Sequence, residues 1–308
     1  MGILEGKVVW VTGAGNGIGK DCALIAAKEG AKVVVNDLGG GIHGDDEGSA
    51  GPAEVVAREI RAGGGKAFSN SDSVTSLKAM EALRDQTLKE FGGLHAVMNP
   101  AGILRDAMFH KMTEADWDKI IEVHLKGHFN VCRATIEHFR EQQDGSYALF
   151  TSTSGLIGNI GQTNYAAAKL GIMGLSRVLA MEGAKFNVRS NIIAPVAWTR
   201  LTQSVPIRDE AQAKRREQMA ALIRPDQPAK LAVALCSDLA KNVSGQIFGA
   251  RGETIELYSQ PRPIMNLTKE SGWTPELIAT EAFGQMKEKF FPVSRSATSP
   301  QPERQTAG

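Results

Sequence analysis

The sequence predicts an α/β protein whose mainly parallel sheet is covered by helices on both faces. Short apolar runs alternate with segments of helical length through most of the 308 residues, and this alternation is typical of right-handed strand–helix–strand units. The runs are apolar at successive positions, as strands buried on both faces must be. No linker interrupts the pattern before about residue 258, so we expect one domain over residues 1–258 and an extension over residues 259–308.

The first half of the pattern opens with an apolar strand and a glycine-rich turn. The elements predicted there are strand 8–11, helix 17–30, strand 32–35, helix 52–62, strand 66–68, helix 75–91 and strand 96–98. A polar loop rich in glycine, residues 38–51, separates the second strand from the next helix. Pro52 suits the start of that helix, because the first helical N–H groups have no intrahelical partner.

The second half begins with a capping sequence, Thr113-Glu114-Ala115-Asp116, which predicts the start of a long helix. The elements predicted after it are that helix to about residue 143, strand 148–151, a helix through Tyr165 to about residue 186, strand 188–193, helices 211–222 and 229–239, and strand 246–248. Within the extension, residues 273–289 suggest one more helix. The Ser, Pro and Gln content from residue 292 onward predicts a disordered tail.

Composition narrows the class of protein. Apolar residues make up 42% of the chain and charged residues 22%, with a net charge of +1. These values are typical of a soluble globular protein and give no reason to expect a nucleic acid or a membrane as a partner. The chain begins directly with a strand and its cysteines, Cys22, Cys132 and Cys236, are far apart. We therefore expect a cytoplasmic protein with reduced core cysteines and no metal site.

The glycine-rich turn from Thr12 to Gly19 predicts a nucleotide site. Gly13, Gly17 and Gly19 allow a tight turn and a close approach of the backbone to a pyrophosphate at the start of a helix. The spacing is G-x-x-x-G-x-G, because Ile18 stands where the strict dinucleotide pattern has its last glycine. A strand before the turn and a helix after it favour a Rossmann-type doubly wound sheet.

Polar and small residues follow the next three predicted strands. Asp37 ends the second strand, where a carboxylate can accept hydrogen bonds from the ribose hydroxyls of NAD and repel the phosphate of NADP; the alternative is that it only begins a loop. Asp72 after the third strand suits the adenine amino group, or forms a turn or helix cap with Ser73. Asn99-Pro100-Ala101-Gly102 after the fourth strand suits close packing on the ribose, although a plain turn is possible.

Tyr165 and Lys169 predict proton transfer. They stand four residues apart, on one face of a helix, and Ser152 precedes the tyrosine by thirteen residues. A phenol has a pKa of about 10 and is a poor base at neutral pH. An ammonium group one turn away favours the phenolate and brings proton transfer closer to neutral pH. Tyr-x-x-x-Lys alone is usually a surface pair, but the serine and the glycine turn strengthen the prediction.

Together these motifs resemble the short-chain dehydrogenase/reductase family over about residues 5–250. Four further segments are similar to the (3R)-hydroxyacyl-CoA dehydrogenase domain of peroxisomal multifunctional enzyme type 2 and to stand-alone actinobacterial dehydrogenases, namely residues 35–40, 101–106, 123–127 and 158–165. No hydratase or sterol-carrier segment follows in this sequence, so the resemblance implies a stand-alone dehydrogenase.

The resemblance implies a role for each matching residue. Tyr165 would be the general acid and base, Lys169 would lower its pKa and bind the nicotinamide ribose, and Ser152 would hold the substrate oxygen. The residues expected to contact or shape the NAD site are Gly13, Asn16, Gly17, Ile18, Gly19, Asp37, Asp72, Ser73, Asn99, Ala101, Gly102, Tyr165, Lys169, Pro195 and Thr199.

The sequence departs from the family pattern at three places. His124 stands where many members have an asparagine that supports a water path from the lysine, and it either holds the same water or packs. Pro100 replaces a common asparagine. Val196 follows Pro195 where glycine is usual, and Thr199 falls one position short of the common spacing.

The substrate pocket is expected from residues 153–164 and 197–222. The basic residues of this region could meet the phosphates of a coenzyme A thioester, although a solvated helix face is the plainer reading; they are Arg200, Arg208, Lys214, Arg215, Arg216 and Arg224. Trp198 and Met219 suit an apolar acyl or sterol pocket, or core packing. The leading function is NAD-dependent oxidation of a 3-hydroxyacyl-CoA. A hydroxysteroid or other bulky alcohol dehydrogenase and a catalytically silent nucleotide-binding scaffold are the alternatives.

The resemblance also implies a homodimer or homotetramer. An apolar patch on two helices could form the two-fold interface, with His128, Val131, Cys132 and Thr135 on the first helix and Met173 and Val178 on the second. The alternative is that these side chains face the sheet of their own subunit.

Overall fold

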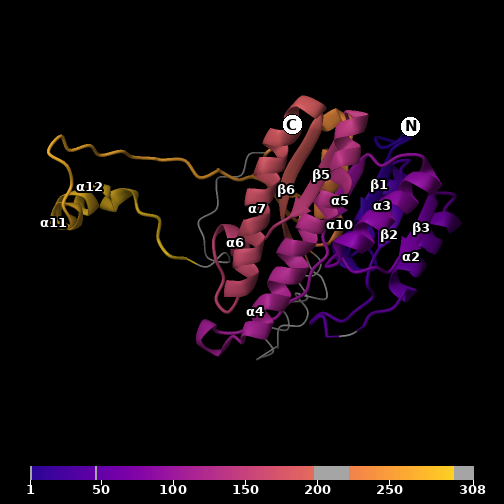
Figure 1. The fold of residues 1–308 in the computed structure, drawn as a ribbon, viewed down its shortest axis with the longest axis horizontal. Helices are drawn as coiled ribbons and strands as arrows, with labels where there is room; N and C mark the ends of the chain where they lie inside the picture. The colour runs from indigo at the N-terminus through magenta and orange to yellow at the C-terminus, as the bar shows by residue number, and fades with distance from the viewer. Residues whose placement is uncertain (1, 46, 198–221, 295–308) are drawn as a thin grey trace.

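A single eight-stranded sheet forms the centre of the molecule (Figure 1). The computed structural model describes residues 2–45, 47–197 and 222–294. The strands are β1 (Val8–Val11), β2 (Lys32–Asn36), β3 (Lys66–Asn70), β4 (Ala96–Asn99), β5 (Gly145–Phe150), β6 (Val188–Val196), β7 (Ile247–Arg251) and β8 (Thr254–Leu257). Their order is β3-β2-β1-β4-β5-β6-β7-β8, and only the β7–β8 pair is antiparallel. The predicted α/β fold with a mainly parallel, doubly wound sheet is confirmed.

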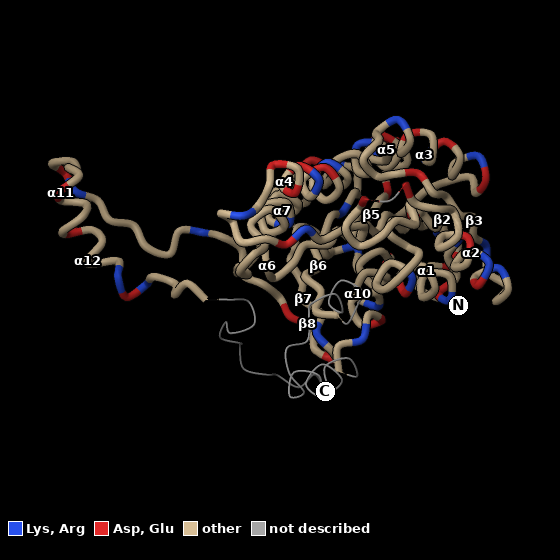
Figure 2. Tube along the Cα trace, turned by 90° about the horizontal axis from the view of Figure 1, so that it is seen from below, with Lys and Arg blue, Asp and Glu red and all other residues tan. Residues whose placement is uncertain are grey.

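Helices cover both faces of the sheet (Figure 2). On one face lie α1 (Gly17–Lys28), α2 (Gly51–Ala62) and α10 (Asp226–Cys236). On the other face lie α3 (Leu77–Phe91), α5 (Gly127–Gln142) and α7 (Thr163–Gly183). Basic and acidic residues are interspersed over the helices in Figure 2, consistent with the net charge of +1.

Each face of the sheet has its own apolar core. Successive strand residues point to opposite faces, so Val9 and Val11 pack toward α1 and α10, whereas Val8 and Trp10 pack toward α3 and α5. All four side chains are fully buried. The three cysteines are free and buried, as expected of reduced core residues. The two cores hold the strands in place, and several of the predicted site residues come directly after the carboxyl ends of β1, β4 and β5.

The long helix predicted after Thr113 is broken. Thr113 and Asp116 form the expected capping box at the start of α4 (Glu114–Ile120). A π-helical turn, η2 (Ile121–Lys126), then separates α4 from α5. Such turns insert an extra residue into the hydrogen-bond ladder and occur frequently at functional sites. The single long helix predicted from the capping sequence is therefore two α-helices joined by this π turn.

Several other boundaries differ from the prediction. β5 begins three residues earlier than expected, and α3 begins at Leu77 because the Ser76 side chain accepts the Ala79 N–H. A short helix, α6 (Thr153–Leu156), and the antiparallel strand β8 were not predicted. β8 follows a turn at Gly252, whose φ of 53° favours glycine. The predicted helix 211–222 lies outside the described residues except for its last position.

The extension leaves the domain as an arm that projects away from the sheet and its helices (Figure 1). The helix predicted over residues 273–289 is a series of short helical segments, α11 (Pro275–Leu277), η5 (Ile278–Ala282), α12 (Phe283–Met286) and η6 (Lys287–Lys289). Thr274 caps the first of them by accepting the Leu277 N–H at 3.2 Å. The predicted disordered tail lies outside the described residues from 295 onward.

Candidate active site

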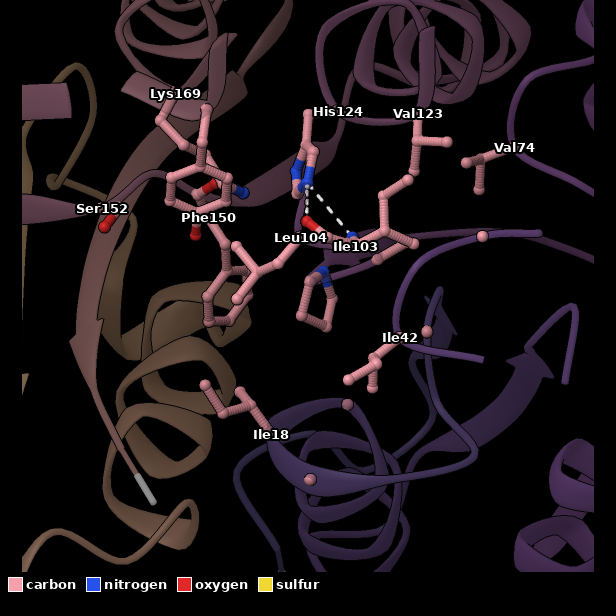
Figure 3. A pocket seen from close by; sticks show the side chains of 18 of the residues that line it. Ile18, Ile42, Val74, Ile103, Leu104, Val123, His124, Phe150, Ser152 and Lys169 are labelled. Carbon is pink, nitrogen blue, oxygen red and sulfur yellow. Dashed lines mark hydrogen bonds between the residues drawn. The ribbon is translucent and has the colours of Figure 1, made fainter. Parts of the chain in front are cut away.

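The predicted site residues meet at the carboxyl ends of the strands. β1 pairs with β2 on one side and with β4 on the other, and a doubly wound sheet has its ligand crevice at such a switch point. A cavity of about 550 Å³ opens there. Every predicted site residue lines it except Asn99 and Thr199; Thr199 lies outside the described residues. Ser152, Lys169 and His124 converge at one end of the cavity, and Ile18 and Ile42 lie at the other (Figure 3).

The glycine turn provides an open helix N-terminus. Gly13 and Gly17 have φ angles of 55° and 53°, which favour glycine. A Cβ on Gly13 would lie 2.8 Å from the Ala101 Cα, and a Cβ on Gly19 would lie 2.0 Å from the Gly13 carbonyl oxygen. Asn16 precedes α1 without a side-chain cap. The first N–H groups of α1 therefore remain available to an anionic group, as binding of a pyrophosphate requires.

Asp37 joins two glycine-rich segments at the edge of the cavity. One carboxylate oxygen accepts the Gly15 N–H and the other accepts the Gly39 N–H, each at 2.7 Å. A Cβ on Gly15 would lie 2.9 Å from this carboxylate. Each carboxylate oxygen has a further acceptor site, so Asp37 can also accept hydrogen bonds from a ribose diol. The chain therefore fits the predicted cofactor at both the pyrophosphate and ribose positions.

Asp72 and Asn99 have structural partners. Asp72 is exposed, accepts the Asn70 side-chain N–H at 2.8 Å and forms a turn while it lines the cavity. Ser73 does not cap α3, because Ser76 occupies the cap position. The Ser73 hydroxyl instead lies 3.0 Å from the Thr75 hydroxyl. Asn99 is buried behind the cavity and accepts a hydrogen bond from the Thr12 hydroxyl. It therefore shapes the turn after β4, and the adenine role of Asp72 stays a prediction.

Ser152, Tyr165 and Lys169 come from two neighbouring elements. Ser152 caps α6, and its oxygen accepts the Ser154 N–H at 3.1 Å. Ser152 is also hydrogen-bonded to Tyr165, and this contact favours the phenolate. Tyr165 and Lys169 lie on α7, with the lysine nitrogen 5.5 Å from the centre of the tyrosine ring. The Lys169 ammonium donates to the Phe150 carbonyl at 2.8 Å.

Burial is the main cause of the pKa shifts of Tyr165 and Lys169. It raises the pKa of Tyr165 to about 12, although the Ser152 hydroxyl acts in the opposite direction. It also lowers the pKa of Lys169 to about 7. The sequence predicted that Lys169 lowers the pKa of Tyr165, but the structure gives a raised pKa. The physical reason is that desolvation disfavours the charged form of both groups.

His124 lies in the π turn and packs edge-on against Tyr165, with ring centres 5.1 Å apart. Its Nε2 is 2.8 Å from the carbonyl oxygen and 3.1 Å from the amide nitrogen of Ile103 (Figure 3). A Cβ on Gly102 would lie 2.2 Å from the imidazole, which explains the glycine there. The other ring nitrogen, Nδ1, is buried and has no hydrogen-bond partner among the described residues.

The surroundings of His124 favour its uncharged form. Burial, and next the charge of Lys169, hold the pKa of this imidazole well below its usual range. A lowered pKa means that the neutral ring persists as pH falls through the ordinary range of histidine. His124 can therefore support a relay only as a neutral hydrogen-bonding group.

Two substitutions at His124 should separate a relay from packing. We expect His124→Asn to keep much of the activity, because its amide can hold a water beside Lys169. His124→Leu should lose at least about tenfold more, since an unmet buried polar group costs about 1–3 kcal/mol. Turnover measured against pH decides between the two roles, and the acid limbs of His124→Asn and wild type should coincide. Higher activity in the leucine variant would contradict the relay.

Three polar residues that the sequence did not single out hold the catalytic elements in place. Asn164 is fully buried and donates to the carbonyls of Arg105 and Asp116 at 3.0 and 3.1 Å, which anchors the start of α7. Thr151 donates to the Lys169 carbonyl at 2.6 Å. Gln162 is buried and bonds three side chains. The position of Asn164 and Gln162 close before Tyr165 was the available signal.

A loop segment, residues 42–45, is also held at the wall of the cavity. In the loop after β2, the Ile42 carbonyl accepts the Leu104 N–H at 3.0 Å. Arg105 donates to the His43 carbonyl at 2.9 Å and forms ion pairs with Asp45 and Asp116. These contacts hold residues 42–45 against the segment that follows β4.

The predicted substrate segments are only partly described. Residues 153–164 form a wall of the cavity through Thr153, Ser154, Asn159 and Gln162, and Pro195 lines it from β6. Trp198, Met219 and the predicted basic residues lie outside the described residues, except for Arg224. Arg224 is paired with Asp226 at 3.0 Å on the surface.

Comparison with known proteins identifies the family. The sequence profile described as short chain dehydrogenase matches residues 7–210. This chain belongs to the short-chain dehydrogenase family. It is 52% identical over 202 residues to a short-chain type dehydrogenase/reductase of Mycobacterium tuberculosis, covering 66% of this chain and 70% of that protein. The Ser152, Tyr165 and Lys169 pattern thus stands in a family in which oxidoreductase chemistry is the rule.

Other relatives extend the similarity toward hydroxyacyl-CoA enzymes. The chain is 48% identical over 241 residues to the peroxisomal multifunctional enzyme type 2 of Mus musculus, covering 78% of this chain but 31% of that protein. It therefore spans about a third of the length of that multifunctional relative. A hydroxyacyl-CoA dehydrogenase of Mycobacterium tuberculosis, ChsB1, is 34% identical over 291 residues, covering 90% of this chain and 88% of that protein.

Solved structures share the fold. A short-chain dehydrogenase from Mycobacterium avium superposes with a TM-score of 0.82 at 35% identity, covering 94% of this chain and 98% of that one. A 7α-hydroxysteroid dehydrogenase complexed with NADH and 7-oxo glycochenodeoxycholic acid has a TM-score of 0.71 at 33% identity, covering 81% and 94% of the two chains. Across the described ranges, none of the helices has both the length and the apolarity needed to cross a bilayer.

Proposed function

We propose that this short-chain dehydrogenase oxidises a secondary alcohol with NAD, and that its substrate is a 3-hydroxyacyl-CoA. The observation that carries the proposal is the arrangement of one cavity. Ser152, Tyr165 and Lys169 line one end, while the glycine turn and Asp37 line the other. The cavity therefore combines a proton-transfer site with a site suited to a dinucleotide.

The preference for NAD rests on Asp37. A carboxylate at the end of β2 accepts hydrogen bonds from two ribose hydroxyls, whereas a phosphate on the same ribose would be repelled. In the 7α-hydroxysteroid dehydrogenase of similar fold, the bound cofactor is NADH.

The residues of this chain would handle the alcohol proton and the oxygen. The cofactor, when bound, supplies the hydride acceptor and a positive charge that favours the phenolate of Tyr165. Tyr165 takes the hydroxyl proton, and Ser152 donates a hydrogen bond to the substrate oxygen as it becomes a carbonyl. Lys169, with a pKa of about 7, can hold or release a proton near neutral pH. Its bond to the Phe150 carbonyl fixes its position.

The 3-hydroxyacyl-CoA assignment rests on the sequence similarity and on the relative that is named hydroxyacyl-CoA dehydrogenase. The decisive experiment measures NADH formation from (3R)- and (3S)-hydroxyacyl-CoA and from a hydroxysteroid, side by side, with NAD or NADP. We expect turnover with NAD and one of the two thioester stereoisomers. Turnover of the steroid alone would overturn the thioester assignment and leave the dehydrogenase activity intact.

A hydroxysteroid or other bulky alcohol is the second candidate substrate. The structure of the similar 7α-hydroxysteroid dehydrogenase holds a steroid product, and the same proton chemistry would act on either alcohol.

The predicted apolar patch for assembly needs correction. Of the residues named on α5, His128, Val131, Cys132 and Thr135 are all buried within their own subunit. They face inward because α5 packs this side against α3 and the sheet. Exposed apolar side chains do occur on the two helices, and they are Phe129, Leu170, Val178 and Met181.

We propose that these exposed side chains form a two-fold interface in a homodimer or homotetramer. The double variant Val178→Glu, Met181→Glu should dissociate into monomers at micromolar concentration, because charge in an apolar interface is strongly destabilising. Light scattering measures the mass of the particle formed by the wild type and by each variant. Val55→Glu on α2, where Val55 is 58% exposed, is the matched control and should keep the oligomer. A monomeric wild type would refute the interface.

A further inference from the structure

Asp106 places a carboxylate in the reaction end of the cavity. It follows β4 by seven residues and lines the cavity together with Ser152 and Tyr165. The residue is exposed, and its charge raises the pKa of Tyr165. The carboxylate is therefore close enough to act electrostatically on the tyrosine that faces the reacting oxygen.

The position of this carboxylate is fixed by Gln162. The Gln162 amide donates to Asp106 at 2.7 Å. Its carbonyl oxygen accepts from the Ser154 hydroxyl at 2.8 Å and from the Asn159 amide at 3.0 Å. Because these bonds assign both ends of the Gln162 amide, the donor must face Asp106. The Ala107 N–H also bonds the Gly161 carbonyl at 2.9 Å, which ties the two segments together.

Among the described residues, no lysine or arginine forms an ion pair with Asp106. Arg105 points toward Asp45, Asp116 and the His43 carbonyl. Partial desolvation raises the pKa of Asp106, the hydrogen bond from Gln162 lowers it, and His43 lowers it further at a distance, without a hydrogen bond. Among the described residues that line the cavity, the lysines are Lys119 and Lys169; Lys119 is paired with Glu122.

We infer that Asp106 is a specificity-determining residue, which excludes substrates that carry a negative charge next to the reacting carbon and admits those with a neutral thioester or ester there. A free 3-hydroxy acid carries its carboxylate only two carbons from the reacting carbon, so it would meet Asp106. The 3-hydroxyacyl thioester of the proposed function, on which this inference rests, is uncharged at that position. Two like charges close together near a protein surface repel enough to change affinity by about tenfold to a hundredfold.

The test compares a 3-hydroxy acid with its methyl ester, which share a carbon skeleton and differ in charge. The ratio of kcat/KM for ester over acid is measured at mildly alkaline pH, where the carboxylate is ionised. Wild type should favour the ester by at least about tenfold. Asp106→Asn keeps an oxygen acceptor for Gln162 and removes the charge, so the ratio should fall by about tenfold, through a gain with the acid.

Two further variants separate charge from geometry. Asp106→Glu keeps the charge and should keep the high ratio. Asp118→Asn removes an exposed carboxylate from α4, away from the cavity, and should leave the ratio unchanged. Thermal unfolding of each variant confirms that it is folded.

The possible outcomes distinguish failure of the Asp106 inference from failure of the proposed function. An active Asp106→Asn enzyme with an unchanged ratio, or an Asp106→Glu enzyme whose ratio falls equally, would overturn the inference and leave the proposed function standing. A wild type that turns over neither the ester nor a 3-hydroxyacyl-CoA would overturn the proposed function. The role of Asp106 in substrate selection would then fall with it.

Discussion

Replacing Tyr165 by phenylalanine should reduce turnover by several orders of magnitude while NAD still binds. The change removes one hydroxyl from a half-buried ring that packs against His124, so the shape of the site is retained. Loss of a general base commonly costs about 10²–10⁴-fold, and loss of a hydrogen bond to the substrate oxygen adds to this. The measurement is steady-state kcat with saturating alcohol, together with a separate titration of NAD binding.

Tyr147 provides the control for this result. Tyr147 is buried in the core below α5, where its hydroxyl lies 2.9 Å from that of Thr135. Tyr147→Phe should therefore change stability by about 0.5–1.5 kcal/mol and leave kcat nearly unchanged. Near-normal turnover in Tyr165→Phe would refute the assignment of Tyr165 as the acid and base.

The wild-type pH profile should have an ascending limb set by Tyr165. Burial raises the pKa of this phenol to about 12. Oxidation requires the phenolate, so activity should rise with pH toward that pKa. A positive charge beside the phenol, such as the one that the bound cofactor would supply, would move the limb to lower pH. The limb should be absent from the residual activity of Tyr165→Phe.

Asp37→Ala should weaken NAD and relax the rejection of NADP. Two charge-assisted hydrogen bonds to the ribose, at about 1.5–3 kcal/mol each, predict a rise in the Michaelis constant for NAD of at least about a hundredfold. The structure adds a second reason, because the carboxylate also accepts the Gly15 and Gly39 N–H groups. Its removal leaves both donors without this partner and loosens the glycine-rich segments. Kinetics with both cofactors measure the effect.

Asp37→Asn separates these two contributions. The amide is similar in shape, removes the repulsion of a 2′-phosphate and can accept only one of the two backbone hydrogen bonds without rearrangement. We expect NADP to gain most with this variant. Asp72→Asn, which removes a neighbouring cavity-lining charge, should have a smaller effect on the choice of cofactor. A wild type that already prefers NADP would show that the role given to Asp37 is wrong.

Local sequence determined the order of the elements and the identity of the main site residues. Apolar runs fixed the strands, because strands covered on both faces must be apolar throughout. Glycines marked the nucleotide turn, since positive φ angles and close backbone contacts exclude side chains there. The Tyr165 and Lys169 spacing placed both groups on one helical face, and the Thr113 capping box set the start of α4. Each of these features depends on residues that are near one another in the chain.

Only the tertiary structure decided how distant segments combine. The π turn at His124, the packing of that ring on Gly102 and the inward direction of His128 and Val131 depend on contacts between elements. So do the burial that raises the pKa of Tyr165 and the network that aims Asp106 into the cavity. Desolvation and hydrogen-bond geometry are properties of a packed environment, and a one-dimensional pattern records which side chains are present but not which of them become neighbours.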